Sequence, residues 1–124
     1  MSFTDAIGTC LRKYATFQGR ARRAEYWWFQ LFLVLACFAV GFLDGLLFGV
    51  PTEGVGVLVS LFLLATFLPT LAVAVRRLHD TDRSGWWLLL GLIPLIGQIL
   101  LIIWYATKGT RGKNRFGPDP LDPA

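Results

Sequence analysis

Three long apolar runs dominate the chain and constrain its fold most strongly. They cover Tyr26–Leu43, Gly54–Val75 and Trp86–Ala106, and the second and third contain no charged residue. A bilayer core about 30 Å thick needs about 20 helical residues, so each run is long enough to cross it. Hydrophobic residues make up 55% of the chain and charged residues only 16%, against about 25% charged in soluble domains. The sequence therefore predicts an all-α, small polytopic integral membrane protein with membrane segments at about 26–48, 54–75 and 86–106.

The residues before the first run predict a further helix. Apolar side chains recur every three or four residues, which is the pattern of one helical face, at Phe3, Ile7, Leu11, Tyr14 and Phe17. Ser2 or Thr4 would cap the start of this helix and Gly19 would end it. We expect an N-terminal amphipathic helix over about residues 3–18, lying in the membrane interface; packing against other parts of the protein is the alternative. Residues 1–108 are predicted to form a single membrane domain, and 109–124 a basic tail rich in glycine and proline.

The basic residues predict the orientation. Lysine plus arginine number five before the first run, none in the first link, three in the second link and four after the third run. Because such residues are in excess on the cytoplasmic side, we expect a multi-pass protein with a cytoplasmic N-terminus. A third full span would leave the tail outside. A segment broken or re-entrant at Pro94 would place all 12 Lys and Arg residues inside, and both paths stay open. Membrane-interface anchors are expected at Trp27, Trp28, Trp86, Trp87 and Trp104.

The stretch RRLHDTDRSGWW, Arg76 to Trp87, places many charges between two apolar runs. One interpretation is an anchor, in which Arg76 and Asp80 pair at helical i,i+4 spacing and the following residues form a turn. The other is a site for an anionic headgroup or a partner, because arginine binds phosphate with two parallel hydrogen bonds. The candidate residues for that site are Arg22, Arg23, Arg76, Arg77, His79, Asp80 and Arg83. Arg20 would lie beside them, and Arg111, Lys113 and Arg115 would join them if the tail lies inside.

Enzymatic function is poorly supported. The chain has one histidine and two cysteines, too few for a metal site of ordinary ligand spacing, and we expect no metal, cofactor or catalytic residue. His79 beside Asp80 lacks a plausible nucleophile, because Ser84 lies in a turn and Cys37 in the membrane. Nucleic acid is not expected as a partner, because the basic residues flank apolar runs and are explained by topology and anionic lipid.

Four blocks of the sequence resemble a known family. They are KYATFQGRARRAEYWWF, LPTLAVAVRRLHDTDRSGWW, LLGLIPLIG and GTRGKNRFGPDP. In this order they resemble the bacterial inner-membrane family catalogued as domain of unknown function 805. The resemblance covers nearly the whole chain and implies a small protein of the bacterial cytoplasmic (inner) membrane, with no established activity. The family pattern often has glycine where this chain has Asp82.

The function expected from these features is non-catalytic. We expect a scaffold or a lipid- or partner-associated protein with a basic cytoplasmic face, bound to the bilayer and to anionic lipid, with a homo-oligomer or another membrane protein as its protein partner. The alternative is a small transporter or channel component that acts as an oligomer or accessory subunit. Gln98, beside the Gly-Pro break of the third run, is the polar residue that this alternative would use.

Overall fold

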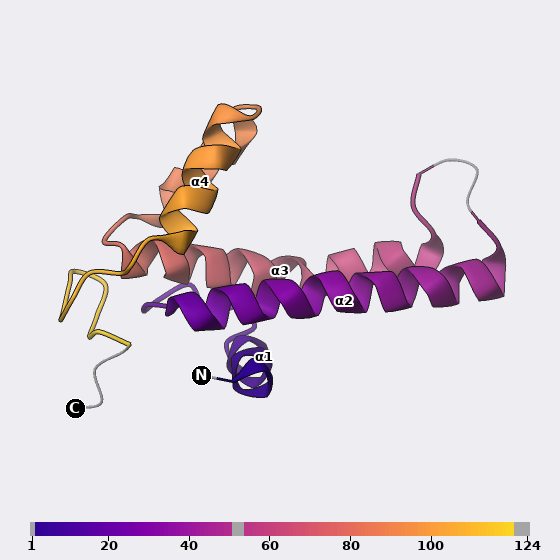
Figure 1. Ribbon diagram of the computed structural model, residues 1–124, viewed down its shortest axis with the longest axis horizontal. Helices are drawn as coiled ribbons and strands as arrows, with labels where there is room; N and C mark the ends of the chain where they lie inside the picture. Colours follow the sequence, from indigo (N-terminus) through magenta and orange to yellow (C-terminus); the bar gives the residue numbers. More distant parts are fainter. Residues whose placement is uncertain (1, 51–53, 121–124) are drawn as a thin grey trace.

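The structure, a computed structural model, describes residues 2–50 and 54–120 and is helical (Figure 1). Its elements in chain order are α1 (Phe3–Arg12), α2 (Arg23–Phe48), α3 (Val57–Asp80), the 3-10 helix η1 (Gly85–Leu92) and α4 (Ile96–Ala106). Within those residues the only β-type pairing is an isolated bridge between Asn114 and Gly117. The all-α class is therefore confirmed. Residues 51–53 of the first link and 121–124 of the predicted tail lie outside the described residues.

Two long helices form the body of the molecule. α2 and α3 run antiparallel, side by side, along its longest dimension (Figure 1). They contain 26 and 24 residues, about 39 and 36 Å at 1.5 Å per residue, which is enough to cross a bilayer core. Large apolar side chains stay exposed along them, among them Phe38 at 74%, Phe42 at 69% and Leu64 at 74%. Two of the three predicted segments are thus long apolar helices, and α3 continues five residues beyond the predicted end.

The third apolar run is not one helix. It divides into η1 and α4, with a break at Ile93–Leu95 that includes Pro94 and places Leu95 at φ 67°. A Cβ on Gly97 would meet the carbonyl oxygen of Leu90 at 1.6 Å, so only glycine lets the two short helices pack together. They form a hairpin that stands away from the α2–α3 pair and returns the chain to the end of α3 (Figure 1). The break lies where Pro94 predicted it, while the path of this hairpin relative to a membrane stays a prediction.

α1 is shorter than expected, because it ends at Arg12 and not near residue 18. Ser2 caps it: the Ser2 hydroxyl accepts from the Asp5 backbone N–H at 3.2 Å, and the Asp5 carboxylate accepts from the Ser2 N–H at 3.4 Å. Beyond Lys13 the chain leaves the helix, and the Tyr14 hydroxyl donates to the Ala65 carbonyl in α3. In Figure 1 α1 is seen end-on where it crosses α2. Its location in a membrane interface stays a prediction.

The protein core lies at one end of the α2–α3 pair, where α2 begins and α3 ends. The hairpin, the segment between α1 and α2, and the tail all pack there (Figure 1). Apolar side chains buried in this core come from four helices and the segment before α2: Cys10, Ala21, Tyr26, Phe29, Val73, Ala74, Leu78, Leu101 and Tyr105. We call this part of the molecule the basic end.

Candidate anion-binding site

The last turn of α3 is internal, although the sequence placed its charges at a surface. Arg76 and Arg77 have no exposed surface, and His79 and Asp80 are 8% and 3% exposed. The side chains of successive helical residues point in different directions around the helix axis. All four can be buried only if other segments of the chain surround this turn of α3. The segment before α2, the start of α2, the end of α4 and the tail supply that cover.

Arg77 joins three segments through its guanidinium group. Its Nε donates to the Tyr105 carbonyl at 2.8 Å, and its Nη1 donates to the Ala21 carbonyl at 3.2 Å. Further bonds go to the Thr107 carbonyl and the Asp80 carboxylate. The end of α4 and the segment before α2 are thereby held on α3. The predicted pair between Arg76 and Asp80 is not formed, because Asp80 pairs with Arg77 and Arg20.

Arg20 holds the tail. Its Nε donates to Asp80 Oδ1 at 2.9 Å. Its other nitrogens donate to tail carbonyls, at 2.6 Å to Gly112, at 3.3 Å to Gly117, and to Thr110. One arginine therefore satisfies three backbone acceptors of the tail that would otherwise need water.

Arg76 has fewer partners. Its Nη1 pairs with the Glu25 carboxylate, which also lies 3.7 Å from Cys10 Sγ. Arg76 Nε and Nη2 are buried and have no partner among the described residues. Burial, and then the charge of Glu25, raise the pKa of the Cys10 thiol to about 12. Cys10 is thus a protonated thiol at neutral pH, a poor nucleophile or metal ligand.

His79 has structural contacts as well. Its Nδ1–H donates to the Gly19 carbonyl at 2.9 Å, and its ring stacks on Phe116 with centroids 4.0 Å apart. The Asn114 amide donates to the His79 carbonyl at 2.9 Å. Two side chains of the tail turn, Asn114 and Phe116, thereby hold it on the end of α3. Among the described residues, His, Cys, Asp and Glu side chains do not gather in a group of three that could hold a metal.

The turn after α3 is more exposed. Asp82 has φ 62°, in the left-handed region that glycine adopts most readily, and this is the position where the family pattern noted above often has glycine. Its carboxylate pairs with Arg115 at 3.2 Å, and both side chains are largely exposed. The Arg83 guanidinium lies over the Trp104 ring, 4.3 Å from its centroid.

The five predicted tryptophan anchors all lie toward the basic end. Trp27 and Trp28 are in the first turns of α2, Trp86 and Trp87 begin η1, and Trp104 lies near the end of α4. Four of them are 38–79% exposed, and Trp104 is half-buried beside Trp87, with ring centroids 5.5 Å apart. Their anchoring role stays a prediction.

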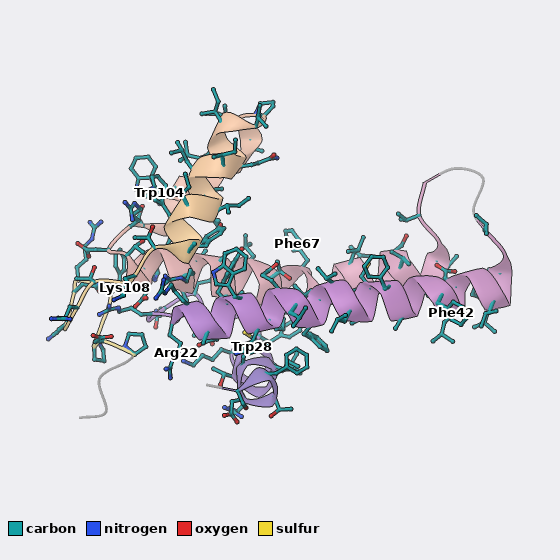
Figure 2. All side chains as sticks on the ribbon, viewed as in Figure 1. Arg22, Trp28, Phe42, Phe67, Trp104 and Lys108 are labelled. Carbon is teal, nitrogen blue, oxygen red and sulfur yellow. The ribbon has the colours of Figure 1, made fainter. Side chains whose placement is uncertain are left out.

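A cavity at the basic end is lined by basic side chains that lie outside the buried network around Arg20, Arg76 and Arg77. It has a volume of about 510 Å³ and is lined by four basic side chains and two carboxylates: Arg22, Arg23, Lys108 and Arg111, with Asp80 and Asp119. Arg23, Lys108 and Arg111 are exposed and Arg22 is half-buried. We call this cavity, with the four basic side chains that line it, the basic cavity. Figure 2 shows Arg22 and Lys108 together at this end, and Phe42 toward the other end.

The electrostatics of the basic cavity favour an anion. Asp80 is already neutralised by Arg20 and Arg77, and Asp119 accepts from the Gly112 N–H at 3.0 Å. Arg22 Nε is buried without a partner among the described residues. Arg22 is also the N-cap residue of α2, where no side chain caps the helix and backbone N–H groups add positive potential. Four cations against two occupied carboxylates leave a net positive cavity.

Only some of the predicted anion-binding residues line this cavity. Arg22, Arg23 and Asp80 do, and so does Arg111, which was expected to join them if the tail lies inside. Arg76, Arg77 and His79 lie in the internal network, and Arg83 lies on Trp104. Lys108 was not predicted, although its place directly after the third run, in KGTRG, is a signal for an interfacial cation. Glu25 was also missed; its signal is that it is the one acid in GRARRAE.

Comparison with known proteins identifies the family of the chain. The profile of a family described as "Protein of unknown function (DUF805)" matches residues 14–118. The chain belongs to this family. The match covers α2, α3, η1, α4 and the first part of the tail, and it begins just after α1. The chain is thus a membrane protein of a family whose description gives no activity.

Similar proteins are known from Escherichia coli K12. "Inner membrane protein YhaH" is 50% identical over 114 residues, covering 91% of this chain and 94% of that protein. "Inner membrane protein YhaI" is 48% identical over 110 residues, covering 89% and 90%. "Uncharacterized protein YiiR" is 31% identical over 137 residues, covering 86% and 87%. No solved structure matches the chain.

Proposed function

We propose that this chain is a non-catalytic protein of the bacterial inner membrane whose basic end binds a phosphate group at the cytoplasmic membrane surface. The basic cavity is the observation that carries the proposal. It offers three arginines, whose planar forks match phosphate oxygens, and one lysine as a point charge. A phosphate there could belong to a lipid headgroup or to a soluble phosphate ester.

The membrane placement is supported by the two long apolar helices and by the names of the E. coli relatives. The orientation is supported by charge. Because the η1–α4 hairpin returns to the end of α3, the basic residues of the leader, the second link and the tail gather at one end of the α2–α3 pair, whereas the link at the other end has no lysine or arginine. An excess of this kind marks the cytoplasmic side. α1 and the tryptophans would then lie at the same interface.

A binding experiment tests the phosphate site. The full chain in neutral detergent micelles is titrated with phosphatidylglycerol and, separately, with inorganic phosphate, by calorimetry. We expect Arg22→Ala plus Arg111→Ala to raise the Kd for phosphatidylglycerol by about a hundredfold, because each lost charge-assisted bond contributes about 1.5 kcal/mol. Binding by the native chain should weaken as salt is added.

The matched control is Lys13→Ala plus Lys113→Ala, which removes the same charge from exposed side chains outside the basic cavity. It should change the Kd less than threefold. Equal weakening by both pairs would mean only general attraction to a basic surface. No weakening by Arg22→Ala plus Arg111→Ala would overturn the proposal, and a response to inorganic phosphate alone would identify a soluble ligand.

A topology experiment tests the orientation. Reporters are fused after Ala124, alkaline phosphatase as the one active only outside and a fluorescent protein as the one active only inside. We expect fluorescence and no phosphatase activity, because the tail binds to the end of α3 through Arg20. Phosphatase activity would contradict a one-sided basic end and would require a third crossing.

A further inference from the structure

A second cavity continues from the basic cavity along α2. It has a volume of about 230 Å³ and is lined by Ala24, Trp27, Trp28 and Leu31. Ala24 also lines the basic cavity, so the two are adjacent and share one wall residue. We call the second cavity the Trp groove. A larger side chain at position 24 would separate the two.

The Trp groove follows the helix axis. Its residues are spaced three, four and seven positions from Ala24, which places them on one face of α2. α2 begins at the basic end and runs from there into its apolar length, so the groove leads from the cations toward the lipid-facing helix. Figure 2 shows Trp28 on this first part of α2, close to Arg22 and far from Phe42.

The walls of the groove are held in place by other rings. Trp28 meets Phe3 of α1 edge-on, with centroids 5.8 Å apart, and Trp27 meets Tyr26 edge-on at 5.0 Å. The outer surfaces remain available, since Trp27, Trp28 and Leu31 are 40%, 38% and 42% exposed. The groove is therefore preformed, apolar and open, as a hydrocarbon site requires.

We infer that the ligand of the basic cavity is a single glycerophospholipid, with its phosphate among Arg22, Lys108 and Arg111 and one acyl chain passing over Ala24 along Trp27 and Leu31. This inference rests on the proposed function and narrows it to a lipid. A soluble phosphate ester would use the cations and leave the groove empty. A lipid uses both cavities, and a ligand whose two parts bind adjacent sites binds more tightly than either part alone. The charge of the first cavity and the apolar character of the second match the two halves of such a molecule.

The first test compares two probes that share a headgroup. The full chain in neutral detergent micelles is titrated with dihexanoyl phosphatidylglycerol and with glycerophosphoglycerol, its deacylated headgroup. We expect the lipid to bind at least about tenfold more tightly, the gain from burying about two methylene groups. Equal affinities would overturn the inference and leave the phosphate site in place.

The second test removes the groove. Trp27→Ala plus Leu31→Ala should lower the affinity ratio between lipid and headgroup by about tenfold. The matched control is Leu35→Ala plus Phe38→Ala, a leucine and an aromatic residue further along α2, exposed at 54% and 74%, and it should leave the ratio within about threefold. A ratio left unchanged by Trp27→Ala plus Leu31→Ala would mean that micelle partitioning alone favours the lipid, and a ratio lowered equally by both pairs would mean general apolar contact along α2. Either result would overturn the inference. If neither probe binds the native chain, or Arg22→Ala plus Arg111→Ala leaves both affinities unchanged, the proposed function itself fails.

Discussion

Two sets of basic side chains lie within the same end of this molecule and have opposite environments. Arg20, Arg76 and Arg77 are buried and bonded to carboxylates and backbone carbonyls. The basic cavity, by contrast, opens to solvent and has few internal partners. The basic residues of this end therefore divide into two sets. One set holds the chain segments of this end together, and the other stays open, as the proposed binding function requires.

The contrast follows from what lies within reach of each side chain. Arg20 and Arg22 are two positions apart, yet Arg20 faces Asp80 and the tail carbonyls while Arg22 faces the cavity. A buried guanidinium is tolerated only with a carboxylate and further acceptors around it. Glu25 and Asp80 are the acids that meet this need, and both are 3% exposed. The buried set would therefore be the wrong place to look for ligand binding.

The largest expected effect separates the two sets by stability. Arg77→Met should lower the free energy of unfolding by about 4 kcal/mol, because it leaves two buried carbonyls, one part-buried carbonyl and part of the Asp80 charge without a donor. Arg111→Met, in the basic cavity, should change it by less than about 0.5 kcal/mol. Denaturation by sodium dodecyl sulfate in mixed micelles, followed by circular dichroism, measures both. Similar losses of unfolding free energy in the two variants would show that the buried arginines and those of the basic cavity do not differ in their contribution to stability.

Much of the fold could be predicted from the sequence, because it depends on local patterns. The two long apolar helices follow from uninterrupted apolar runs, and the break in the third run follows from Pro94. The charged network could not be predicted, because its pairs are distant along the chain: Arg76 and Glu25 are 51 residues apart, and Arg20 and Gly112 are 92 apart. Local spacing suggested Arg76 with Asp80, and the observed i,i+3 pair is Arg77 with Asp80. Three of the acceptors of Arg20 are backbone carbonyls of glycine and threonine, which carry no sequence signal.

The next largest effect concerns the arginine with the fewest partners. Glu25→Gln should cost about 3 kcal/mol of unfolding free energy, because Arg76 is fully buried and two of its nitrogens already lack partners among the described residues. Replacing both residues, Glu25→Met plus Arg76→Met, should return stability to within about 1 kcal/mol of the native chain, since an apolar pair needs no compensation. A double variant as unstable as Glu25→Gln would contradict this. It would show that the loss does not come from an unpaired Arg76 charge.

The smallest effect concerns an ion pair outside the buried network. Asp82→Asn should change the free energy of unfolding by about 0.5 kcal/mol or less, because the Asp82–Arg115 pair is largely exposed and solvent screens it. Asp82→Ala removes the same pair and should cost about 1 kcal/mol more, because φ 62° is unfavourable for alanine and tolerated by asparagine. The two variants thus separate the backbone from the charge in one denaturation series. The contrary result is that both variants lose the same unfolding free energy, about 1 kcal/mol or more. The exposed Asp82–Arg115 pair would then stabilise the fold as much as the buried pairs do. Exposure would not explain why some basic residues of this protein are structural and others are not.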